Sequence, residues 1–125
     1  MNEVAGLILF AHGARDERWR APFEAIRAEV TKVHPGPVAL AFLELMQPSL
    51  GEAARSLAEA GTSRAVVVPL FLGVGRHLRE DLPGLAEEAS RTSGCRLEIA
   101  AAAGENPDVI GALARYAISA LDKHG

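Results

Sequence analysis

The chain has 125 residues, of which 49% are hydrophobic and 23% charged, and this composition is typical of one folded domain spanning residues 1–125 rather than of a disordered segment. Its formal net charge of −3 disfavours a protein that binds nucleic acid through a general positive field. The sequence shows no secretory signal and no apolar run of the about 20 residues that a membrane-crossing helix needs. Its single cysteine permits no internal disulfide, which fits a reducing cytoplasm. Together, the charge, the apolar runs and the cysteine count predict a cytoplasmic protein without nucleic-acid or membrane partners.

The first half of the chain alternates between two kinds of segment. An apolar run of strand length, Gly6–His12, is followed by amphipathic helical spacing over residues 18–33, with Trp19 in a core or an interface. The prolines Pro35 and Pro37 end this helix, and His34 just before them is expected to be exposed to solvent. A second apolar run, Val38–Leu43, leads into a second helix over residues 48–60.

The second half repeats this alternation. The expected strands are 65–72 and, more weakly, 97–101, and the expected helices are 78–92 and 106–122. Strands that are apolar on both faces are typical of buried parallel sheets. The order of strand and helix therefore predicts an α/β domain with a doubly wound, mainly parallel four-stranded sheet and helices on both faces.

Metal-competent side chains lie at or just beyond the ends of three predicted strands. His12 ends the first strand, Glu44 follows the second and His77 comes after the third. The carboxyl ends of parallel strands share one edge of the sheet, where ligands of such folds bind, so these three side chains are expected to converge. Two imidazoles and a carboxylate suit a first-row divalent ion such as Co²⁺, Fe²⁺ or Ni²⁺.

The same residues also permit a plainer interpretation. Each histidine alone fits a loop-bonding or helix-starting role, and Glu44 alone fits a surface carboxylate. The loops also contain Gly13 and Gly75, which allow a backbone to approach a ligand closely, and Arg15 and Arg76, which suit carboxylate groups. The glycines lack the spacing of a dinucleotide site and no phosphate-loop lysine follows them, which disfavours a nucleotide.

Three ordered motifs resemble those of the sirohydrochlorin chelatases, which are class II tetrapyrrole chelatases that need no ATP. The resemblance covers about residues 6–83 and is weaker afterwards. The motifs are Leu7-Ile8-Leu9-Phe10-Ala11-His12-Gly13-Ala14-Arg15-Asp16, then Ala41-Phe42-Leu43-Glu44 with Gln47-Pro48-Ser49-Leu50, and then Val67-Val68-Pro69-Leu70-Phe71-Leu72 with Gly75-Arg76-His77 and Asp81-Leu82-Pro83.

The resemblance implies a chelatase-like fold and insertion of Co²⁺ or Fe²⁺ into sirohydrochlorin, for cobalamin or siroheme synthesis, with no cofactor beyond the divalent metal substrate. It makes His12 and His77, with Glu44, the metal-binding and catalytic residues. Longer relatives carry two such domains, so a chain with one implies a homodimer. The tetrapyrrole would lie against loop residues such as Leu45 and Met46, with its acetate and propionate groups held by the arginines and by loop N–H groups.

Two other functions remain open. A non-catalytic carrier of metal or tetrapyrrole would use the same site without a proton acceptor. A histidine phosphatase would explain His12, Gly13 and Arg15, but that chemistry needs an arginine just before the histidine, where this chain has Ala11. A response-regulator receiver is disfavoured too, because the acidic pair and the lysine of that fold are missing.

Overall fold

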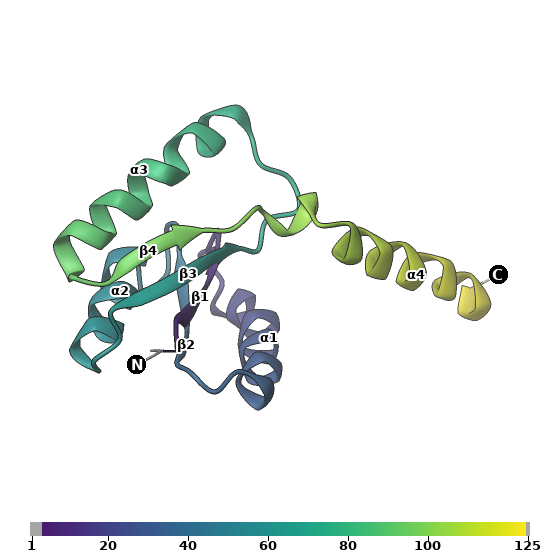
Figure 1. Cartoon of the computed structure of the whole chain (residues 1–125). Helices are drawn as coiled ribbons and strands as arrows, with labels where there is room; N and C mark the ends of the chain where they lie inside the picture. The colour runs from purple at the N-terminus through teal and green to yellow at the C-terminus, as the bar shows by residue number, and fades with distance from the viewer. Residues whose placement is uncertain (1–3, 125) are drawn as a thin grey trace.

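A computed structural model describes residues 4–124 and has four strands, all parallel, in the order β2-β1-β3-β4 (Figure 1). This confirms the predicted α/β fold. The strands are β1 (Gly6–Ala11), β2 (Val38–Phe42), β3 (Arg64–Pro69) and β4 (Arg96–Ile99). The helices are η1 (Glu17–Trp19), α1 (Arg20–Val33), α2 (Leu50–Glu59), α3 (Arg76–Ser93), η2 (Ala103–Glu105) and α4 (Pro107–His124), where η marks a 3₁₀ turn.

The predicted boundaries are wrong by a few residues around the third strand. The strand β3 ends at Pro69, where it pairs with Phe10, rather than at Leu72. The N–H of Leu70 still donates to the carbonyl oxygen of Phe10 at 2.8 Å, and the chain leaves the sheet after this bond. The helix α3 begins at Arg76 rather than Leu78, which places His77 in its first turn.

One face of the sheet packs against α2 and α3. Every second strand residue points to this face, as Ile8 and Phe10 do in β1. The buried helix residues recur at intervals of three and four, which is the spacing that forms one apolar stripe. They are Leu50, Ala53, Ala54 and Leu57 of α2 and Leu82, Ala86 and Ala89 of α3.

The opposite face packs against α1 alone. Leu9 and Ala11 of β1 point to it, and they form a second cluster with Leu40 and Phe42 of β2, against which Phe23 of α1 packs. At the outer strand β4 this face carries the charged side chains of Arg96 and Glu98, whose nearest atoms are 3.3 Å apart. Helices thus lie on both faces, but the second face is covered mainly over β1 and β2.

The last helix does not lie on the sheet. After β4 the chain forms η2, and α4 then projects away from the rest of the molecule (Figure 1). None of its residues is buried, and its contacts with other elements are chiefly with η2.

Two further observations complete the fold. Within residues 4–124 no helix is long and apolar enough to cross a membrane. His34 is half-buried, with its Nε2 atom 2.8 Å from the carbonyl oxygen of Ala5, so the prediction of a solvent-exposed side chain is wrong. The ring fills the corner between the end of α1 and the segment before β1, where only a hydrogen-bonding group satisfies that carbonyl.

Candidate functional site

The loops that carry His12 and Glu44 are joined through their backbones. The N–H of Glu44 donates to the carbonyl oxygen of His12 at 3.1 Å, one residue beyond the bond from Leu43 to Ala11 at 2.8 Å. Gly13 follows with φ +91°, and a Cβ atom there would collide with the carbonyl oxygen of Glu44. Glycine is thus required for this close approach, which fixes the spacing of His12 and Glu44.

The His12 ring rests on an aromatic side chain. Its centroid lies 4.3 Å from that of Phe71, with the two ring planes 34° apart. Phe71 is almost fully buried and also contacts Phe10, so it is a fixed platform. The imidazole is exposed on its other side, so His12 is positioned by packing yet open to solvent.

The third predicted ligand lies at the start of α3. Gly75 precedes the helix in an extended conformation, and its carbonyl oxygen accepts the first helical bond from the N–H of Arg79 at 3.0 Å. His77 is exposed in the first turn, where N–H groups have no helical partner and anions are favoured.

His12, Glu44 and His77 border one open cavity of about 710 Å³ at the carboxyl-terminal edge of the sheet. A site of this size is within the range of small-molecule pockets. Its wall also contains apolar side chains from the loop after β2 and from α3. The complete lining is His12, Leu43, Glu44, His77, Leu78, Asp81, Gly84, Leu85 and Glu88.

The three predicted ligands do not form a closed metal cage. Among the residues that the structure describes, no three His, Cys, Asp or Glu side chains are grouped closely enough to hold an ion by themselves. Structural metal sites are saturated by protein ligands, whereas sites that exchange or react keep positions open. In this structure the three side chains border one cavity without forming one coordination site.

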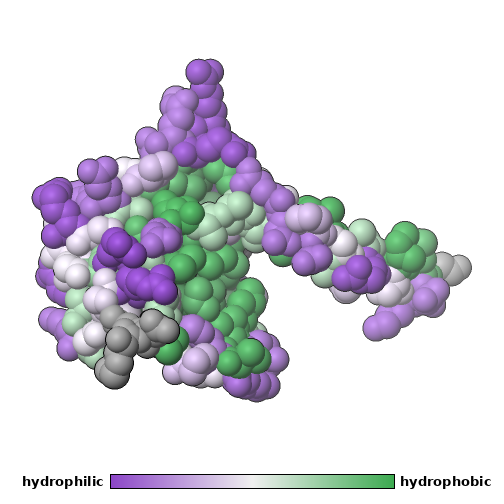
Figure 2. Space-filling model, viewed as in Figure 1, coloured by the Kyte–Doolittle hydropathy of each residue, from purple (hydrophilic) through white to green (hydrophobic). Residues whose placement is uncertain are grey.

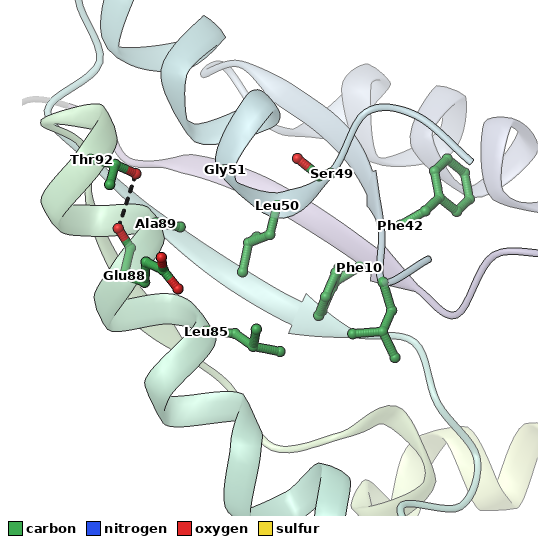
Figure 3. A pocket seen from close by; sticks show the side chains of 10 residues that line it. Phe10, Phe42, Ser49, Leu50, Gly51, Leu85, Glu88, Ala89 and Thr92 are labelled. Atoms are coloured by element: carbon green, nitrogen blue, oxygen red, sulfur yellow. Dashed lines mark hydrogen bonds between the residues drawn. The ribbon is translucent and has the colours of Figure 1, made fainter. Parts of the chain in front are cut away.

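A second hollow of about 240 Å³ lies inward, between α2 and α3. Figure 3 shows Leu50 of α2, Phe10 of β1 and Leu85 of α3 around it. It shares Leu43, Leu85 and Glu88 with the cavity that the histidines border. The two hollows thus adjoin along two leucines and one glutamate.

From the sequence, His77 was expected at this cavity, but the later α3 residues that line it were not. Asp81 is part of the third motif, and Leu85 and Glu88 were not among the expected site residues. All three follow His77 at helical spacing, so a helix starting before His77 would have placed them on one face. The signal was present, but the predicted helix began one residue too late to include the histidine.

Several predicted substrate contacts lie elsewhere. Arg15, Arg76 and Gly75 are exposed and do not belong to the lining, and the Nε atom of Arg76 lies 3.3 Å from Glu80. Leu45 is exposed, with its backbone at φ +67°. Met46 is buried in the core cluster beneath α1, away from the cavity lining, because its side chain points to the opposite face of the sheet.

The chain is similar to known proteins over almost its full length. The sirohydrochlorin cobaltochelatase of Sulfolobus acidocaldarius is 32% identical over 122 residues, which are 98% of this chain and 97% of that protein. The crystal structure of the CbiX protein from Marinobacter aquaeolei VT8 is 33% identical, with a TM-score of 0.86 over 95% of this chain and 98% of that one.

A longer protein shares the fold. The sirohydrochlorin chelatase SirB from Bacillus subtilis subspecies spizizenii, solved in complex with cobalt, is 23% identical, with a TM-score of 0.72 over 90% of this chain and 49% of SirB. Finally, the model of the CbiX family matches residues 6–120, a range that includes all four strands and the histidines of the cavity. On this match and the full-length similarity to its relatives, the chain belongs to the CbiX family.

Proposed function

We propose that this protein is a sirohydrochlorin chelatase that inserts a divalent metal ion, Co²⁺ in preference to Fe²⁺, into the tetrapyrrole. The observation that carries the proposal is that His12, Glu44 and His77 border the same open cavity. Membership of the CbiX family and the names of the curated relatives support the choice of substrate and metal.

The incoming ion is a substrate, and its ligands must release it. Neutral His12 and His77 hold the ion with two nitrogen donors, and water or Glu44 fills other positions. As the macrocycle arrives, its four nitrogens replace these ligands one after another. An incomplete set of protein ligands favours this exchange, because a saturated site would compete with the product for the metal.

Insertion also releases two pyrrole N–H protons. Each N–H bond breaks as its electron pair forms a bond to the metal, and the proton passes to a base at the cavity wall. A histidine or Glu44 accepts it, since imidazole and carboxylate groups are common proton acceptors in enzymes. The protons then leave to solvent through the open mouth of the cavity.

The macrocycle has an apolar ring and a charged periphery, and the cavity has both kinds of surface. Leu43, Leu78 and Leu85 provide apolar contact for the ring. The exposed Arg15 and Arg76, close in sequence to the two histidines, bind the acetate and propionate groups, for which Arg76 exchanges its contact with Glu80. Binding of these peripheral groups holds the centre of the ring over the histidines.

We further propose that the reaction takes place in the cytoplasm and requires neither ATP nor a resident cofactor. The sequence after Gly75 has no dinucleotide or phosphate-loop pattern, which supports a reaction without ATP or a dinucleotide cofactor. We also propose a homodimer, since the chain spans about half the length of SirB, which shares the fold.

An anaerobic insertion assay tests the proposal. Sirohydrochlorin is mixed with the protein and with Co²⁺, Fe²⁺ or Ni²⁺, and the absorbance change of the macrocycle is followed. We expect His12→Ala and His77→Ala each to lower the rate by about a hundredfold or more, with unchanged circular dichroism. The control is His124→Ala, which alters an exposed histidine at the end of α4.

Two outcomes would contradict the assignment. Full insertion rates in both cavity variants would remove the histidines from the chemistry. Tight binding of cobalt and sirohydrochlorin without acceleration over the uncatalysed reaction would instead indicate a carrier.

A further inference from the structure

The start of α3, which carries His77, has little apolar packing of its own. The buried residues of this helix begin at Leu82, and between Arg76 and Asp81 only Leu78 is half-buried. Figure 2 shows this end of the helix as a hydrophilic projection at the top of the molecule. Since most of the stability of a helix in a protein comes from packing its apolar face, the first turn depends on other contacts for its position.

The turn η2, far away in the sequence, provides such a contact. Figure 1 shows η2 beside the loop that joins β3 to α3. The Nη1 atom of Arg79 donates to the Oε1 atom of Glu105 at 2.8 Å. The other oxygen of this carboxylate, Oε2, accepts the N–H of Ala102 at 3.2 Å, and Ala102 is buried. The carboxylate is thus held from two sides and gives Arg79 a fixed partner.

The contact between Arg79 and Glu105 is ionic but remains open to water. The Arg79 guanidinium lowers the pKa of Glu105, first through its hydrogen bond and then through its charge, and the N–H of Ala102 lowers it further. The two side chains are 61% and 42% exposed. Ion pairs exposed to this extent add little to the stability of a whole protein. We therefore expect the pair to act on the local geometry of α3 rather than on the free energy of unfolding.

The same turn also bonds to the support of His12. The N–H of Gly104 donates to the carbonyl oxygen of Phe71 at 2.9 Å. A Cβ atom at position 104 would collide with the carbonyl group of Leu72, so glycine is required for this close approach. The Phe71 ring supports the His12 ring, with 4.3 Å between the two centroids. Through two adjacent residues, η2 thus contacts both segments that place the histidines.

We infer that Glu105 is a positioning residue for metal insertion, because its contact with Arg79 holds His77 at the cavity relative to His12. The kinetic part of this inference rests on the proposed chelatase function, but the holding of the helix start does not. Arg79 follows His77 by less than one helical turn, so release of Arg79 also releases the histidine. A displacement of about 1 Å at a reacting centre can cost about a hundredfold in rate.

A double-mutant cycle on the insertion kinetics tests the inference. We expect Glu105→Ala and Arg79→Ala each to lower kcat by about tenfold, while KM for sirohydrochlorin changes by less than about twofold. The double variant should be no slower than Glu105→Ala alone, because both changes remove the same contact. Tm should fall by no more than about 4 °C in each variant. The control is Glu98→Ala, which breaks an exposed ion pair with Arg96 on β4 and should keep the wild-type kcat.

Three kinetic results would overturn the inference. An unchanged kcat in Glu105→Ala would show that the contact does not matter for the reaction. Effects of the two substitutions that multiply in the double variant would show that the residues act separately. A KM for sirohydrochlorin raised in Arg79→Ala but not in Glu105→Ala would instead make Arg79 a direct contact of the substrate.

Hydrogen–deuterium exchange measures the holding of the helix start without any reference to chemistry. We expect the N–H groups of residues 79–82 to exchange several-fold faster in Glu105→Ala than in the wild-type protein, and at the wild-type rate in Glu98→Ala. Unchanged exchange in Glu105→Ala would overturn the inference even if insertion became slower. A wild-type protein that inserts no metal would contradict the proposed function, and the exchange rates would still decide whether Glu105 holds the start of α3.

Discussion

At the scale of single residues, Gly13 has the most constrained position near the cavity. It combines a positive φ with a place directly against the carbonyl group of Glu44. The same contact sets the spacing between the loops that carry His12 and Glu44, so this glycine links the stability of the fold to the geometry of the site.

Gly13→Ala is expected to destabilise the protein by about 1–3 kcal/mol and to slow insertion, because the backbone must move to admit a methyl group. Gly73→Ala is the control, since Gly73 lies in the loop after β3 with open space around its Cα. It should change stability by less than about 0.5 kcal/mol. Urea denaturation of the three proteins measures both values, and equal effects would refute the close-approach argument.

Asp81 faces the cavity one turn after His77 and adds negative charge near the proposed path of the metal. Asp81→Asn should raise the Co²⁺ concentration for half-maximal rate several-fold while the maximal rate changes less, because a carboxylate concentrates cations close to the cavity mouth. Glu87→Gln removes the same charge from the same helix but outside the cavity lining. Insertion rates measured over a range of Co²⁺ concentrations compare the two, and equal shifts would leave only a general charge effect.

At the scale of elements, the start of α2 is defined by a reciprocal cap. The Oγ atom of Ser49 accepts the N–H of Glu52 at 3.2 Å, and the Glu52 carboxylate accepts the N–H of Ser49 at 2.8 Å. Both bonds satisfy N–H groups that a helix leaves without partners.

Ser49→Ala should therefore lower the free energy of unfolding by about 1 kcal/mol. Ser56→Ala, in the exposed middle of α2, should be neutral or slightly stabilising because alanine has the higher helix propensity. Thermal melts of both variants distinguish a capping effect from a general serine effect, and an equal melting temperature for both would contradict it.

Most elements could be predicted because their sequences carry local signals. Apolar runs predict the four strands. Helical spacing predicts α1, and Pro35 and Pro37 predict its end. The start of α3 was missed because Arg76 and His77 are polar and only the structure places them in the first turn. Local patterns also say nothing about where an amphipathic helix packs, so the projecting course of α4 was not foreseen.

At the scale of the whole molecule, the sequence predicts which strand ends meet at the site but not the direction of each side chain. Strand-end topology brought His12, Glu44 and His77 to one cavity as expected, since parallel strands end at a common edge. Side-chain direction decided the rest: Met46, two residues after Glu44, points into the core beneath α1. Whether these residues carry the chemistry stays a prediction for the insertion assay.

If the proposed homodimer couples the unfolding of two chains, the stability of the protein will depend on its concentration. Raising the protein concentration a hundredfold should raise Tm by about 5 °C for a dimer of this size, because unfolding then releases two chains. Calorimetry at several concentrations provides the measurement, and a constant wild-type Tm would contradict coupled unfolding.

The outer strand β4 has a consequence for how copies of this protein meet. It is only four residues long, and its alternate side chains, Arg96 and Glu98, are charged. A short, charged edge strand pairs poorly with a strand of another molecule, so aggregation by edge-to-edge pairing of sheets is disfavoured even at high protein concentration.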